Sequence, residues 1–222
     1  MVFQVEKFDQ DLISIHCKVF QTYPMIDEYQ KAAIRYRPDR IRVLFLAESP
    51  PAPRPCRPPS YFFFPNSFSD LLFATVIFAL YGIRYKKDPV LKESLLQKFR
   101  ADGFWLMDAV EYPINNIPKP HRPEKVRADL PNLLGRLNSL RQEGVLDETS
   151  GIAIIMEDVW KLLAPVLAEQ GYYILNRNRY IGFPGYYYDQ RTVDEIRKIL
   201  PSFLGSMHAH GGPKKTPPSL NS

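Results

Sequence analysis

Short apolar runs alternate with longer amphipathic stretches over most of the 222-residue chain. Four runs rich in β-branched and aromatic residues are too short for helices and therefore predict buried strands. They cover residues 41–47, 104–110, 151–156 and 172–175. Elsewhere hydrophobic residues recur every three or four positions, which predicts helices. These cover residues 8–19, 25–36, 67–80, 88–103, 123–141, 157–170 and 191–204.

Local signals indicate where several of these helices begin or bend. Ser67 and Asp70 are spaced as in a capping box, so they predict a helix that starts at Ser67. Asp88 and Pro89 supply an N-cap and a first-turn proline for the next helix. Pro131 lies inside a helical pattern and predicts a kink or a split there.

Strands that alternate with helices predict a parallel sheet with helices on both faces. We therefore expect an α/β fold, a three-layer α/β/α arrangement around a four-stranded, mainly parallel sheet. With 45% hydrophobic residues, 222 residues suit one domain. We assign residues 1–38 to N-terminal helices and residues 40–204 to the α/β core, together one domain. Residues 205–222 are rich in Gly, Pro, Ser and Lys and predict a disordered tail.

The composition narrows the class of protein. No apolar run approaches the roughly 20 residues of a membrane span, and the first residues lack a signal-peptide pattern. Two cysteines, Cys17 and Cys56, are too few for a disulfide framework or a four-cysteine cluster. We expect a cytoplasmic protein with no membrane partner and no iron–sulfur cluster, and we leave its oligomeric state open.

The net charge of +5 weakly favours a polyanionic partner such as DNA. Aromatic residues beside arginines can stack on bases, although core packing accounts for most of the 13 Tyr and 14 Phe. Six cations lie in loops that we expect at the active edge of the sheet, where they suit contacts to phosphates. They are Arg54, Arg57, Lys119, Arg122, Arg177 and Arg179.

Polar residues follow the predicted strands at their carboxyl ends, the edge at which open α/β sheets bind ligands. Glu48 and Ser49 follow the first strand, Asp108 ends the second, and the basic, aromatic loop 176–190 follows the fourth. Ser49 has no Gly-x-Ser-x-Gly elbow around it, so a serine hydrolase is not expected. The sequence has no Gly-rich phosphate loop and no zinc-binding spacing, so we expect no metal and no cofactor.

Four segments in this order resemble the uracil-DNA glycosylase superfamily. Residues 47–51, AESPP, resemble the GEAPG motif of one branch, and residues 60–63, SYFF, follow where the superfamily carries a base-stacking aromatic. Residues 106–110, LMDAV, match the strand that carries its base-reading Asn, and residues 183–186, FPGY, match its His-Pro-Ser-Pro segment. The resemblance spans residues 40–204 and implies cleavage of an N-glycosidic bond in DNA, without a metal.

The resemblance also implies roles for individual residues. Glu48, with Ser49, would form the catalytic pair and position the attacking water. Either Phe62 or Phe63 would stack on the base, and Asp108 would read its edge. The remaining two substrate-binding residues that the resemblance implies are Phe183 and Tyr186.

Two departures from the family pattern change the expected substrate. Phe183 stands where the family carries a His, and Asp108 stands where it carries an Asn. An ionised Asp only accepts hydrogen bonds, so Asp108 would repel a carbonyl edge, and uracil is a poor match. We expect a damaged or deaminated base instead.

The alternatives are a catalytically silent nucleic-acid-binding module and a nucleoside- or nucleotide-binding enzyme. Structurally, Glu48 and Asp108 also suit hydrogen bonds to nearby loop amides.

Overall fold

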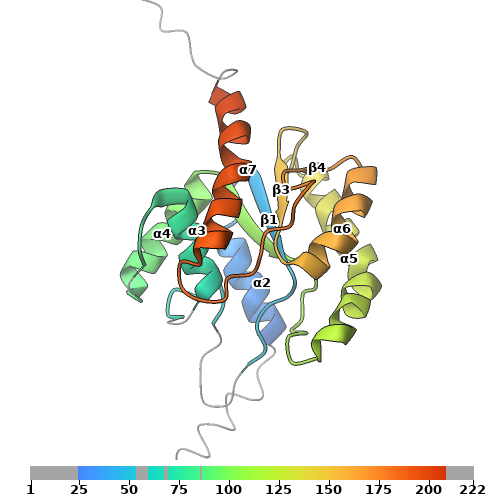
Figure 1. Cartoon of the computed structure of the whole chain (residues 1–222), viewed down its shortest axis with the longest axis horizontal. Helices are drawn as coiled ribbons and strands as arrows, with labels where there is room; N and C mark the ends of the chain where they lie inside the picture. The colour runs from blue at the N-terminus through green and yellow to red at the C-terminus, as the bar shows by residue number, and fades with distance from the viewer. Residues whose placement is uncertain (1–24, 54–59, 68–69, 86, 209–222) are drawn as a thin grey trace, which may run out of the picture.

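A computed structural model of the chain describes residues 25–53, 60–67, 70–85 and 87–208 (Figure 1). The predicted helix at residues 8–19, both cysteines, Arg54 and Arg57 lie outside the described residues. None of the helices in the described part of the chain is long and apolar enough to cross a membrane.

The centre of the molecule is a four-stranded sheet. Its strands are β1 (Val43–Ala47), β2 (Phe104–Asp108), β3 (Gly151–Ile154) and β4 (Tyr173–Ile174). Their order across the sheet is β2-β1-β3-β4, and every pairing is parallel. The expected parallel sheet is therefore confirmed. The two central strands are buried along their whole length, because helices cover them on both faces.

Six α-helices and one short 3₁₀ helix surround the sheet in the described residues. They are α2 (Met25–Arg35), α3 (Leu71–Tyr81), α4 (Pro89–Ala101), η1 (Lys119–His121), α5 (Arg122–Gln142), α6 (Glu157–Glu169) and α7 (Gln190–His208). In Figure 1, α3, α4 and α7 lie on one side of the sheet, and α5 and α6 lie on the other. The three-layer α/β/α arrangement agrees with the sequence prediction.

Two helix ends differ clearly from their predictions, and one helix is not divided. The helix predicted to start at Ser67 begins at Leu71, because Asp70 accepts a hydrogen bond from the Phe73 N–H and is its N-cap. Pro131 does not split α5, which is assigned as one helix of 21 residues. The last helix continues to His208, so residues 205–208 are helical, and the expectation of a disordered tail from residue 205 was wrong there.

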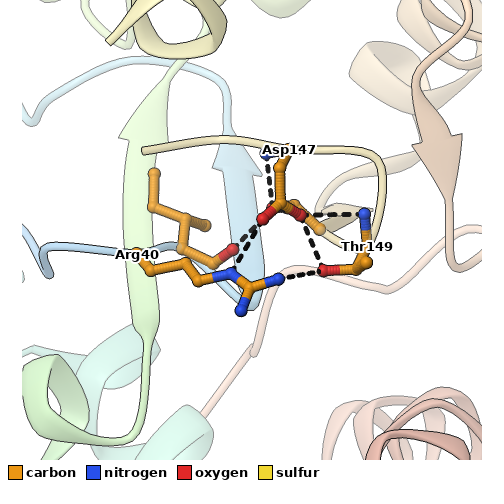
Figure 2. A network of polar contacts seen from close by, with 5 residues as sticks. Arg40, Asp147 and Thr149 are labelled. Carbon is orange, nitrogen blue, oxygen red and sulfur yellow. Dashed lines mark hydrogen bonds and ion pairs between the residues drawn. The ribbon is translucent and has the colours of Figure 1, made fainter. Parts of the chain in front are cut away.

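A polar network closes the amino-terminal edge of the sheet (Figure 2). The Arg40 guanidinium donates hydrogen bonds to the Asp147 carboxylate at 2.8 Å and to the Thr149 hydroxyl at 2.9 Å. Asp147 also accepts from the Thr149 N–H at 2.8 Å. Ser150 donates to the carbonyl of Ile41 at 2.6 Å. These contacts fix the turn before β3 against the start of β1.

Candidate active site

The strand register places the ends of β1 and β2 side by side. Ala47 pairs with Asp108, so Glu48, the next residue, leaves the sheet beside the end of β2. A cavity of about 360 Å³ opens at this carboxyl edge. It is lined by residues from several loops, including six that the sequence singled out: Glu48, Ser49, Phe62, Asp108, Arg122 and Phe183.

Glu48 is a buried carboxylate in the wall of this cavity, with 7% of its surface exposed. Its Oε2 lies 3.5 Å from Nη1 of Arg122, and the carbonyl of Glu48 accepts a backbone hydrogen bond from Val110. Burial raises the pKa of Glu48, and the Arg122 guanidinium opposes that rise. Glu48 is therefore anchored through its backbone, with one cation beside its carboxylate.

Arg122, the first residue of α5, is fixed by the loop before it. Its Nε donates to the carbonyl of Ile117 and its Nη2 donates to the carbonyl of Asn115, both at 2.9 Å. Nη1 faces Glu48, so all three guanidinium nitrogens of Arg122 have partners within the protein. Arg122 thus orients Glu48, and this geometry does not favour the phosphate contact expected from the sequence.

Asp108 ends β2 and also lines the cavity. Burial raises its pKa to about 7, while the Arg136 charge and a hydrogen bond from Tyr61 act in the opposite direction. Arg136 directs two N–H groups at the carbonyls of Asp108 and Ala109, at 3.0 and 2.8 Å. A carboxyl group with this pKa is about half protonated at neutral pH, so it both donates and accepts. The premise that Asp108 only accepts therefore applies to its ionised form alone.

Ser49 lines the cavity but is held by the loops around it. Its hydroxyl donates to the carbonyl of Pro50 at 3.3 Å and accepts from the Ile114 N–H at 3.4 Å. Both bonds are long, and they tie the loop after β1 to the loop after β2. Ser49 therefore positions the cavity wall.

The two candidate stacking residues have different surroundings. Phe62 lines the cavity and packs edge-on against Phe73 at 5.3 Å between ring centroids. Phe63 is fully buried and lies parallel to the ring of Tyr36 at 5.9 Å, away from the cavity lining. Consecutive residues of this turn point in different directions, so of these two residues only Phe62 lines the cavity, with 3% of its surface exposed. The alternative that Phe63 stacks on the base is corrected.

The loop after β4 reaches the same cavity by a specific local geometry. The side-chain amide of Asn176 donates to the Ile154 carbonyl and accepts from the Ile154 N–H, which extends the β3–β4 pairing. Further on, Met156 donates its N–H to the carbonyl of Ile181 at 2.8 Å. Phe183 follows at the cavity rim with 50% of its surface exposed.

The other predicted binding residues in the described chain lie outside the cavity. Tyr186 is 62% exposed and does not line it. Lys119 is exposed and lies 3.9 Å from Asp158 of α6. Arg177 and Arg179 are exposed, and Arg177 lines a separate hollow against α6. Of the described cations, Arg122 lines the cavity and the charge of Lys119 acts on Glu48 in its wall, whereas Arg177 lines another hollow.

Two features of the cavity were missed by the sequence reasoning. Asp70 lines it as a third carboxylate, and its Oδ2 lies 3.5 Å from Nζ of Lys92, a fully buried lysine. The capping pattern was the available signal for Asp70, but its lysine partner is 22 residues away. Met156 lines the cavity with φ 77, a left-handed conformation that non-glycine residues adopt at a cost of about 1–3 kcal/mol.

In the part of the chain that the structure describes, no group of three His, Cys, Asp or Glu side chains is arranged to hold a metal ion. No protein-family model, curated protein or solved structure matches this chain. The fold is therefore described as α/β with a parallel sheet, and its relation to the uracil-DNA glycosylase superfamily stays a proposal.

Proposed function

We propose that this protein is a glycosylase-like hydrolase, which cleaves the N-glycosidic bond of a damaged or deaminated base in DNA. One observation carries the proposal. A single cavity at the carboxyl edge of the sheet is lined by two carboxyl groups from adjacent strand ends and by an aromatic ring. These are Glu48, Asp108 and Phe62, which lie far apart in the sequence.

The cavity suits a planar, hydrogen-bonding ligand. Its volume of about 360 Å³ lies in the lower part of the range of small-molecule pockets, about 300–1,000 Å³. Phe62 supplies an apolar wall and Phe183 an aromatic group at the rim, while Asp108 supplies a polar atom for the edge of a base. An extruded base needs stacking and hydrogen bonds of this kind to offset the cost of leaving the helix.

Glu48 suits the chemical step. Hydrolysis at C1′ of the sugar builds positive charge on the ring and needs a water molecule aimed at that carbon. A buried carboxylate stabilises such charge strongly, because little solvent screens it. The Arg122 guanidinium keeps Glu48 oriented and favours its ionised form.

A second candidate is hydrolysis of a free nucleoside. The contacts of the described cations favour this reaction. Arg122 donates hydrogen bonds to loop carbonyls, and Lys119 lies near Asp158. Arg177 lies in another hollow. A substrate without a chain of phosphates needs fewer such contacts.

The test is a base-release assay on oligonucleotides and on free nucleosides that carry uracil, hypoxanthine, xanthine or an oxidised base. The wild type is run beside Glu48→Gln, with Glu169→Gln as a control on the exposed surface of α6. We expect Glu48→Gln to lower base release by about 10²–10⁴-fold and the control to leave it unchanged. Release from oligonucleotides that falls steeply with salt supports the DNA substrate.

Other outcomes of the assay separate the alternatives. Release from nucleosides alone, insensitive to salt, supports the second candidate. Salt-sensitive DNA binding without release of any base makes the protein a binding module. Absence of both release and binding contradicts the proposal.

A further inference from the structure

Asp108 and Tyr61 belong to two cavities at once. Besides the candidate active site, both line a second cavity of about 300 Å³ that is also bounded by α2, β2 and α5. Trp105 and Arg136 are among its other lining residues. The Asp108 carboxyl group thus stands in a wall between two openings, and its surroundings differ from those of Glu48 on the same edge.

The cations beside the two carboxyl groups are used differently. Arg122 places Nη1 3.5 Å from the carboxylate of Glu48. Arg136, by contrast, donates hydrogen bonds from both Nη groups to the backbone carbonyls of Asp108 and Ala109. Glu48 therefore has a charged partner that opposes the rise in its pKa, whereas the side chain of Asp108 has only the hydroxyl of Tyr61 as a described hydrogen-bonding partner. In hydrolases, two carboxyl groups in different surroundings can take different roles, one as the general acid and the other as the carboxylate.

We propose, on the basis of the function proposed above, that Asp108 is the general acid of the reaction and that the substrate carries a base that must be protonated as it leaves. A purine that leaves from its N9 position is neutralised by a proton on another ring nitrogen. Asp108 lies at the cavity wall where the edge of a base held against Phe62 would face it.

The step balances as follows. The C1′–N9 bond breaks with its electron pair on the base, and the Asp108 carboxyl group gives its proton to the base. A water molecule forms the new C1′–O bond and gives a proton to the Glu48 carboxylate. The base and the hydroxylated sugar leave, and one proton passes from Glu48 through solvent to restore Asp108. No further reactant is needed.

The charged and titratable groups around Asp108 are consistent with this role. Burial is the largest influence and raises its pKa to about 7, with smaller contributions in the same direction from the Asp70 and Glu48 charges. Arg136 and the Tyr61 hydroxyl oppose that rise. A general acid works best when its pKa lies near the working pH. Activity should fall at high pH as Asp108 loses its proton.

The test compares two leaving groups in matched oligonucleotides and nucleosides. Deoxyinosine needs a proton on its departing base, whereas 7-methyldeoxyguanosine already carries a positive charge on the purine. We expect Asp108→Asn to lower hypoxanthine release by about 10²–10⁴-fold and to lower 7-methylguanine release by a factor at least about tenfold smaller. An equal loss on both substrates would overturn the acid role and leave Asp108 as a binding residue.

A second variant tests the role through its pH profile. Tyr61→Phe removes a hydrogen bond that favours ionised Asp108, so the alkaline limb of hypoxanthine release should move to higher pH. A limb that does not move in Tyr61→Phe, or that persists in Asp108→Asn, contradicts the inference. If wild type releases a base and Asp108→Asn releases it at the same rate, the acid role fails and the glycosylase proposal stands. If wild type releases no base at all, the proposed function itself fails.

Discussion

The two edges of the sheet use their carboxylates in opposite ways. At the amino-terminal edge, Asp147 is surrounded by donors from Arg40 and Thr149. Burial alone would raise the pKa of Asp147, but the hydrogen bonds from Thr149 and Arg40 lower it overall. At the carboxyl-terminal edge, burial raises the pKa of both Glu48 and Asp108.

The opposite pKa shifts distinguish two kinds of carboxylate. A carboxylate that is held by several donors is stabilised in its ionised form and contributes to folding. A carboxylate that is buried with fewer donors is costly to the fold, and such groups concentrate at functional sites. The edge with raised pKa values is also the edge that carries the cavity. Four predictions test this contrast.

The largest expected effect concerns Asp70, a carboxylate in the cavity lining whose ion-pair partner, Lys92, is fully buried. Lys92→Met leaves Asp70 buried without its ion-pair partner, so we expect the free energy of unfolding to fall by about 3–5 kcal/mol. Urea unfolding at pH 7 measures it. Lys98→Met, in the exposed Lys98–Asp102 pair of the same helix, is the control and should cost less than about 1 kcal/mol. Equal losses would contradict the assignment.

The next effect is a dependence on pH at Asp108. Its pKa is about 7 in the fold and about 3.9 when unfolded, so its contribution to stability falls as pH rises from about 4 through 7. Asn does not titrate. Asp108→Asn should therefore gain stability relative to wild type between pH 5 and pH 8 by about 2–3 kcal/mol, because about two of the roughly three pKa units of the shift lie above pH 5, at about 1.4 kcal/mol each. Urea unfolding of both proteins at pH 5 and pH 8 measures their free energies of unfolding. If the difference between the two proteins is the same at both pH values, the pKa of Asp108 is not raised.

Asp147 should behave with the opposite sign. Because its pKa is lowered in the fold, its stabilising contribution is present above the unfolded pKa and is lost as pH falls through the folded pKa. Asp147→Ala should cost about 1–2 kcal/mol at pH 7, from lost charge-assisted hydrogen bonds, and less near pH 3. Thermal unfolding at the two pH values checks this. Base release at pH 7 should be unaffected, since Asp147 lies at the other edge.

The smallest effect on stability is expected at Tyr186, which lies at the carboxyl edge beyond the cavity. Its side chain is 62% exposed, so Tyr186→Ala should change the free energy of unfolding by no more than about 0.5 kcal/mol. A role in binding DNA would instead weaken oligonucleotide affinity by about 1 kcal/mol or more, the value of one stacked base. Fluorescence anisotropy with a labelled oligonucleotide measures that affinity. A large loss of stability would show that Tyr186 is structural.

The fold was predictable because its signals are local. Each strand was found within its predicted range, for example β1 at Val43–Ala47 inside residues 41–47. Parallel pairing follows from alternating strands and helices. The start of α3 was placed too early, because Ser67 and Asp70 fit the same capping pattern and only the hydrogen bond to Phe73 distinguishes them.

The site was predictable in position and less so in detail. Asp108 ends β2 and Glu48 follows the end of the adjacent strand β1, so their approach follows from the topology. Which of several consecutive aromatic residues faces the cavity depends on the turn at residues 61–66, and periodicity does not describe a turn. The hydrogen bonds that hold Arg122 go to carbonyl groups in the loop before α5. The pKa of Asp108 depends mainly on how deeply its carboxyl group is buried. Neither can be obtained from the order of residues.

The conformation of Met156 has a consequence for engineering the protein. Glycine would adopt the same φ without strain, so the chain keeps a thioether at the rim of the cavity at a standing cost to its stability. Methionine has three rotatable bonds and a polarisable sulfur, and it adapts its shape to a neighbouring ring. Met156→Gly would remove the strain and widen the rim together. This position is therefore where a variant with a broader choice of ligands is best sought.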